Sequence, residues 1–141
     1  MLYLTGQIAI DPKTDHMISG DIRNQTYQVL RNLEAVLNAA VSSVEQLAHC
    51  LIMLTNIEQD YEIVNKIYSE WFISPEFHPA RSSIGVAKLS FDATIAIECQ
   101  ELIQQKRFDE LILDDYNLFS HTFLCDDWLG LVVVLTDNGD S

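Results

Sequence analysis

A proline-led arginine motif is the part of this sequence best suited to chemistry. Pro79, Ala80 and Arg81 directly precede a β-type run that begins at Ser82. Because proline restricts the backbone just before the strand, Arg81 is expected to lie at the mouth of that strand. A guanidinium there can offer two parallel donors to a carboxylate in a bidentate, charge-assisted contact. The alternative is a surface ion pair with one of the 21 acidic residues, and composition alone favours that alternative.

Three further positions could contribute to a site. Gly6 follows Thr5 in the first β-type run, where a glycine lets another group approach the backbone closely; the alternative is a β-bulge. His49 falls in an apolar run of strand length, which is more typical of a buried, hydrogen-bonded histidine than of a ligand. His78 lies in a predicted loop close to Arg81 and could reach the same site, although a structural role is the more common one.

Several other chemistries lack their sequence signatures. The chain contains no G-x-S-x-G, no Walker loop and no G-x-G-x-x-G. Cys50, Cys99 and Cys125 form no C-x-x-C pair, so we expect neither a disulfide framework nor a metal site, but buried thiols in a reducing cytoplasm. The 8 Lys and Arg against 21 Asp and Glu give a net charge of −13. This charge argues against binding to nucleic acid and to an anionic membrane surface.

The periodicity of the apolar residues predicts the elements that position these side chains. Strands are expected over 2–10, 48–55, 82–87 and 94–101, and amphipathic helices over 21–41 and 61–72. The run 48–55 is continuously apolar, which is typical of a strand buried on both faces. With 141 residues the chain suits one domain. The order of the elements predicts an α+β sandwich, in which two helices pack on one face of a mixed sheet.

A series of motifs along the first 102 residues resembles one family. The motifs are LYLTGQI followed by DPKT, then GDI, NL, VN, PARS and IAIE, and they occur in order without a large gap. Together they are similar to those of the Rid/YjgF family of reactive-intermediate deaminases. The resemblance implies a chorismate-mutase-like fold, a homotrimer, and ligand clefts between neighbouring subunits.

The resemblance also implies an activity and a set of site residues. Members of this family hydrolyse enamines and imines such as 2-aminoacrylate to 2-keto acids and ammonia, without a metal or another cofactor. By this resemblance Arg81 would hold the substrate carboxylate, Gly6 and Ser83 would offer backbone contacts, and Asn65 would help to shape the cleft. A small carboxylate is therefore the expected ligand, and the cytoplasm is the expected location.

Two departures from the family pattern keep a second hypothesis open. Ala96 stands where deaminating members carry the glutamate that orients the attacking water. Glu98 is the candidate replacement, two residues further along the same strand face and therefore displaced by roughly 6–7 Å. In addition, the family's first strand and a tyrosine of its cleft precede the point where this sequence begins. The chain is thus expected to be a deaminase, with reduced activity, or a non-catalytic protein that binds small carboxylates.

The last part of the chain has no counterpart in the resemblance. Segment 103–141 contains 8 acidic and 2 basic residues, so it contributes −6 of the net charge of −13. We expect the Rid-like domain to cover 1–102 and this acidic extension to follow it. The apolar run Leu131–Leu135 has the composition of a strand, and a third reading is that it covers a sheet edge left without a partner.

Overall fold

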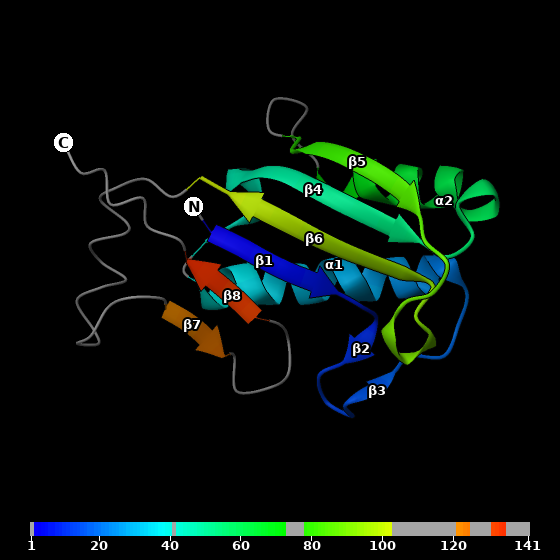
Figure 1. Ribbon diagram of the computed structural model, residues 1–141, viewed down its shortest axis with the longest axis horizontal. Helices are drawn as coiled ribbons and strands as arrows, with labels where there is room; N and C mark the ends of the chain where they lie inside the picture. The colour runs from blue at the N-terminus through cyan, green and yellow to red at the C-terminus, as the bar shows by residue number, and fades with distance from the viewer. Residues whose placement is uncertain (1, 41, 73–77, 103–120, 125–130, 135–141) are drawn as a thin grey trace.

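The computed structural model describes residues 2–40, 42–72 and 78–102, and the backbone of 121–124 and 131–134. Figure 1 shows how the elements are arranged. In chain order they are β1 (Leu2–Gln7), β2 (Ile10–Asp11), β3 (His16–Met17), α1 (Ile22–Ala39), a 3-10 turn (Val44–Gln46), β4 (Leu47–Leu54), α2 (Ile57–Trp71), β5 (Ala80–Gly85), a second 3-10 turn (Ser90–Asp92), β6 (Ile95–Glu101), β7 (His121–Leu124) and β8 (Leu131–Val134).

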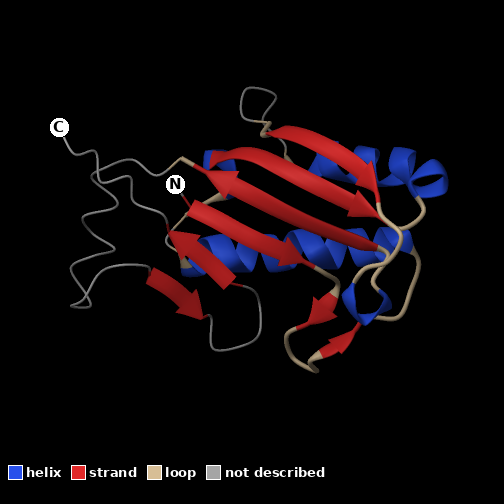
Figure 2. Cartoon of the chain, in the orientation of Figure 1, coloured by secondary structure: helices blue, strands red, loops and turns tan. Residues whose placement is uncertain are grey.

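The main sheet is mixed and carries both helices on one side. Its strand order is β5-β4-β6-β1-β8-β7, in which β4 and β5 are parallel and the other neighbours are antiparallel. Helix α1 packs against β1 and β6, and α2 packs against β4 and β5. Figure 2 shows both helices behind the sheet, so no helix of the described residues lies on its other side. The predicted α+β class, with two helices on one face of a mixed sheet, is confirmed.

Helix α1 forms where its apolar spacing predicts it. Asp21 caps its N-terminus, because the side chain accepts hydrogen bonds from the backbone N–H groups of Arg23 and Asn24, each at 3.1 Å. The face turned to the sheet is completely buried and builds most of the core with the strands. Its members are Val29, Leu30, Leu33, Val36 and Leu37.

The side chains of strand β4 alternate between the two faces of the sheet. Cys50, Ile52 and Leu54 are buried beneath the helices, whereas the alternate residues, His49, Leu51 and Met53, are only half-buried on the other face. The prediction that this strand is buried on both faces is therefore wrong for the single chain. Apolar residues on the helix-free face explain the error, because a continuous apolar run does not reveal which face is covered.

The edge of strand β1 is covered by a strand from near the C-terminal end of the sequence. Strand β8 pairs antiparallel with β1, with Leu2 opposite Val134 and Leu4 opposite Val132, and β7 extends the sheet by one more strand. The prediction that the 131–135 run covers an otherwise unpaired sheet edge is confirmed for the four residues of β8. Apart from β7 and β8, the predicted acidic extension lies outside the described residues.

Neither helix could span a membrane. Helices α1 and α2 are the long helices of the described ranges, and neither combines the length and the continuous apolar character that a bilayer crossing requires. This finding agrees with the amphipathic character of both helices, each of which buries one face against the sheet.

Candidate functional site

Arg81 lies on the edge strand β5 and points towards the helix layer. In the parallel pairing of β4 with β5, Arg81 lies beside Cys50, which is completely buried beneath the helices. Since neighbouring residues in register project to the same side of a sheet, the Arg81 side chain enters the space between β5 and α2. The residues next to it, Ala80 and Ser82, are exposed.

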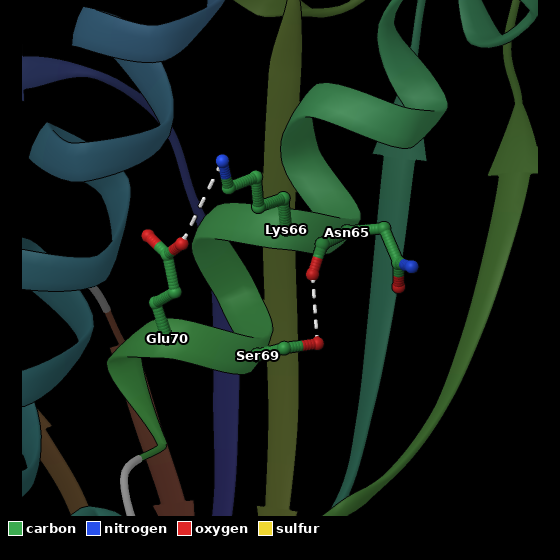
Figure 3. A network of polar contacts seen from close by, with 4 residues as sticks. All are labelled: Asn65, Lys66, Ser69 and Glu70. Carbon is green, nitrogen blue, oxygen red and sulfur yellow. Dashed lines mark hydrogen bonds and ion pairs between the residues drawn. The ribbon is translucent and has the colours of Figure 1, made fainter.

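Two residues of helix α2 hold the guanidinium of Arg81. The Arg81 group lies over the ring of Tyr68, with 4.8 Å between its central carbon and the ring centroid, in a cation–π contact. It also donates a hydrogen bond from Nη2 to Oδ1 of Asn65. Asn65 and Tyr68 are three residues apart and therefore lie on one face of the helix. Figure 3 shows that the Asn65 side chain points away from the Lys66–Glu70 ion pair. The Ser69 hydroxyl donates a hydrogen bond of 2.9 Å to the backbone oxygen of Asn65.

The Arg81 guanidinium keeps donors for a ligand. A guanidinium has five N–H donors, and Asn65 accepts from one of its nitrogens. The ion pairs found among the described residues join Lys66 to Glu70 and Lys88 to Asp92, so Arg81 has no carboxylate partner there. The surface ion pair that composition favoured for Arg81 is thus not formed within the described part of the chain. A half-buried, oriented and unneutralised guanidinium is suited to binding a carboxylate.

Tyr68 is a platform for Arg81 and not an acid or a base. Its side chain is buried, and its ring lies 4.5 Å from that of Phe72 in a tilted arrangement. Burial raises the pKa of the Tyr68 hydroxyl well above its usual value, and the positive charge of Arg81 opposes that shift with a smaller effect. The hydroxyl is also buried, and it has no hydrogen-bond partner among the described residues. The hydroxyl is therefore neutral at physiological pH.

His78 has a structural role at the end of α2. Its Nε2 contacts the backbone oxygen of Phe72, the residue that ends the helix, so this nitrogen carries the proton and donates. A donor at this position satisfies one of the carbonyl groups that a helix leaves unpaired at its C-terminus. The structure therefore gives His78 the structural role that was the more common of its two predicted alternatives.

The remaining predicted site residues are divided between the two faces. Ser83 is half-buried two residues after Arg81, and it pairs with the buried Ile52, so it projects to the helix side. Glu98 is half-buried on the helix-free side, where it lines a pocket of about 350 Å³ together with His49 and Thr5. The single chain therefore brings Arg81 and Asn65 together, but it places Glu98 on the opposite face of the sheet.

Gly6 lies in a β-bulge, which was its alternative explanation. The pairing of β1 with β6 shifts its register between Leu4 and Gln7, opposite the stretch of β6 that leads to Glu98. A Cβ placed on Gly6 would meet the Met53 methyl at 3.8 Å, an ordinary van der Waals contact. The fold itself therefore does not require a glycine here.

Cys50 and Cys99 form a disulfide, which the sequence argument did not predict. The two residues lie opposite each other on the antiparallel strands β4 and β6, on the helix-covered face. The expectation of buried thiols is wrong for this pair. Their separation of 49 residues along the chain carried no pairing signal, because only the strand register brings them together.

Sequence reasoning missed Tyr68, although a usable signal was present. Asn65 had been singled out, and an aromatic residue three positions later on a predicted helix falls on the same face. No group of three or more potential metal ligands occurs in the part of the chain that the structure describes.

Comparison with known proteins identifies the family. The family model described as Endoribonuclease L-PSP matches residues 1–102. A RutC family protein of Pyrococcus horikoshii is 40% identical over 97 residues, which cover 69% of this chain and 75% of that protein. The chain belongs to the Rid/YjgF family. Another relative, a 2-iminobutanoate/2-iminopropanoate deaminase of Dermatophagoides farinae, is 34% identical over 103 residues, 73% of this chain and 78% of that one.

Solved structures of Rid proteins have the same fold. A crystal structure described as a putative endoribonuclease of Thermotoga maritima superposes with a TM-score of 0.68 at 33% identity, covering 73% of this chain and 80% of that one. The E. coli protein TdcF, solved with bound serine, has a TM-score of 0.66 at 28% identity and covers 73% of this chain and 81% of that one. The predicted Rid fold is therefore confirmed for the matched part.

Proposed function

We propose that this protein is a Rid-type deaminase that hydrolyses enamines and imines such as 2-aminoacrylate to 2-keto acids and ammonia. The observation that carries the proposal is the Arg81 guanidinium, which Asn65 and Tyr68 orient and no carboxylate of the described residues neutralises. Two relatives support the same reaction class: one named 2-iminobutanoate/2-iminopropanoate deaminase, at 34% identity, and one named Reactive Intermediate Deaminase A, at 35% identity.

The reaction demands little beyond positioning. The enamine takes up a proton at its terminal carbon to become an imine, and water then adds to the imine carbon. The carbon–nitrogen bond breaks after the nitrogen has been protonated, so that ammonia leaves and the keto group remains. Arg81 would hold the substrate carboxylate, and Glu98 would accept the proton of the attacking water and return it to the leaving nitrogen. Backbone groups of Gly6 and Ser83 would complete the contacts to the carboxylate end.

The placement of these residues favours a site shared between subunits. Arg81 lies on the helix side of the sheet, and Glu98 lies on the other side of the same chain. One substrate can contact both groups only if each comes from a different copy of the chain. We therefore propose a homotrimer, with the small-carboxylate site between neighbouring subunits. Half-buried apolar residues on the helix-free face, Leu51 and Met53 among them, support burial of that face in an assembly.

A coupled assay tests the proposed activity. A serine dehydratase generates 2-aminoacrylate from serine, and pyruvate formation is followed with and without the protein. The proposal expects faster release of pyruvate, lost in Arg81→Ala and kept in Arg31→Ala, which removes the same charge from an exposed position on α1. Wild-type protein that is folded and yet leaves the rate unchanged would contradict the catalytic proposal.

A non-catalytic protein that binds small carboxylates is the second candidate. The observation that favours it is Ala96, which lies beside Met53 in the sheet and is 3% exposed, so no carboxylate occupies that position. This candidate expects 2-ketobutyrate to bind the wild type without any turnover of 2-aminoacrylate, and not to bind Arg81→Ala. Activity created by Ala96→Glu would then identify the missing acid. Turnover by the wild type would exclude this candidate.

A further inference from the structure

The helix-free face of the sheet has a polar pocket that the carboxylate clamp does not use. Strands β1, β4 and β6 line this pocket, whose volume is about 350 Å³. Its polar groups are the Tyr3 and Thr5 hydroxyls, the His49 ring, the Glu98 carboxylate and the Gln100 amide, and Leu51 adds an apolar wall. The helices lie on the other side of the sheet, so they do not cover this pocket (Figure 2). We call this site the open-face pocket.

The charge of the open-face pocket is negative. Among the described residues, Glu98 is its one acidic lining residue, and neither lysine nor arginine lines it. Glu98 forms no ion pair within the described ranges, where the ion pairs are Lys66–Glu70 and Lys88–Asp92. A half-buried carboxylate without a counter-ion gains from a bound cation, because partial exclusion of water strengthens their attraction. The net charge of −13 adds a long-range attraction for cations and disfavours anions.

His49 adds a directional acceptor to the open-face pocket. Its Nε2 lies 3.4 Å from Oγ of Ser82 on β5. When Nε2 carries the proton and donates to that hydroxyl, Nδ1 has a free lone pair. Gln100 lies directly opposite His49 on the neighbouring strand and contributes an amide oxygen. An ammonium group has several N–H donors on one positive centre, and these donors can satisfy this set of acceptors. A metal ion fits less well, because the pocket offers it too few charged or soft ligands.

We propose that the open-face pocket binds a small protonated amine. The apolar wall at Leu51 accommodates a short hydrocarbon chain, and Glu98, His49 and Gln100 receive the ammonium protons. This inference deepens the proposed function, because Glu98 is also the proposed proton acceptor. It assigns to the open-face pocket the nitrogen end of the substrate, or the amine product, and leaves the carboxylate end to Arg81. The substrate class is then an amino or imino acid with its charges bound by different groups.

Binding of small charged and neutral probes tests this proposal independently of the proposed deaminase activity. The probes are n-butylammonium, butyrate and n-butanol, added to ¹⁵N-labelled full-length protein while amide shifts of β1, β4 and β6 are followed. We expect n-butylammonium to move these signals, n-butanol to bind at least tenfold more weakly, and butyrate to leave them in place. Equal shifts from butyrate, or none from n-butylammonium, would overturn the proposal.

Three variants locate the ammonium. Glu98→Gln keeps the shape of the side chain and is expected to weaken n-butylammonium binding at least tenfold, while Glu45→Gln removes the same charge from an exposed position and leaves binding unchanged. Arg81→Ala is expected to bind n-butylammonium at least as tightly as the wild type does, because it removes a positive charge from the proposed substrate site. Unchanged affinity in Glu98→Gln, or loss of affinity in Arg81→Ala, would overturn the proposal. A protein that binds n-butylammonium but releases no pyruvate from 2-aminoacrylate would contradict the deaminase proposal alone.

Discussion

The two faces of the sheet hold functional groups in opposite ways. On the helix-covered face, Arg81 is fixed by a ring contact to Tyr68 and a hydrogen bond to Asn65, so the clamp is assembled within one chain. On the helix-free face, Glu98 and His49 line the open-face pocket, and the contact of His49 with Ser82 is long at 3.4 Å. The difference indicates that packing holds the Arg81 guanidinium more firmly than it holds the His49 ring.

The disulfide is the strongest constraint on the helix-covered face, and breaking it gives the largest expected effect. Joining Cys50 to Cys99 closes a loop of 49 residues and restricts the unfolded chain. Cys50→Ser with Cys99→Ser is expected to lower the free energy of unfolding by about 2–5 kcal/mol, measured by urea denaturation. Cys125→Ser is the control. Equal stability of the double variant and the wild type, both without reductant, would show that the disulfide does not support this face.

Arg81 should account for most of the affinity for carboxylates. Removing a bidentate, charge-assisted contact costs about 3 kcal/mol, so Arg81→Ala is expected to weaken 2-ketobutyrate binding on the order of a hundredfold in calorimetry. Arg81→Lys keeps the charge but loses the planar pair of donors and the ring contact, and it should recover only part of that loss. Wild-type affinity in Arg81→Ala would place the carboxylate elsewhere, and the helix-covered face would lose its proposed role.

Asn65→Asp tests whether Arg81 must remain unneutralised. The two side chains have the same shape, but the aspartate would pair with the guanidinium and compete with the ligand's carboxylate. We expect 2-ketobutyrate to bind about tenfold more weakly, with no loss of thermal stability, because the new pair is itself favourable. Asn65→Ala, which removes the bond without adding a charge, should have a smaller effect. Tighter binding in Asn65→Asp would contradict the view that a free positive charge is what the clamp provides.

The sequence predicted the helix-covered face better than the open one. Apolar spacing located α1 and α2, and the PARS and VN motifs pointed to Arg81 and Asn65. In contrast, the Cys50–Cys99 pair and the pocket around His49 depend on strand register, which local patterns do not specify. The apolar run of β4 predicts burial on both faces, because a sequence shows hydrophobicity but not which neighbour covers each face. The sequence likewise does not predict that Arg81 and Glu98 lie on opposite faces of the sheet, since this depends on how β5 and β6 pair with β4.

Tyr68→Phe gives the smallest expected effect and tests how the platform under Arg81 works. The Tyr68 hydroxyl is buried and has no hydrogen-bond partner in the part of the chain that the structure describes, so its removal should leave the free energy of unfolding unchanged or raise it by up to about 1 kcal/mol. Phenylalanine keeps the ring face towards the guanidinium, so carboxylate affinity should change less than threefold. Tyr68→Leu keeps an apolar side chain but removes the ring, and it should weaken binding several-fold more than Tyr68→Phe does. If Tyr68→Phe impaired binding as much as Tyr68→Leu, the hydroxyl itself would contact the ligand, and the helix-covered face would also be a site completed only on binding.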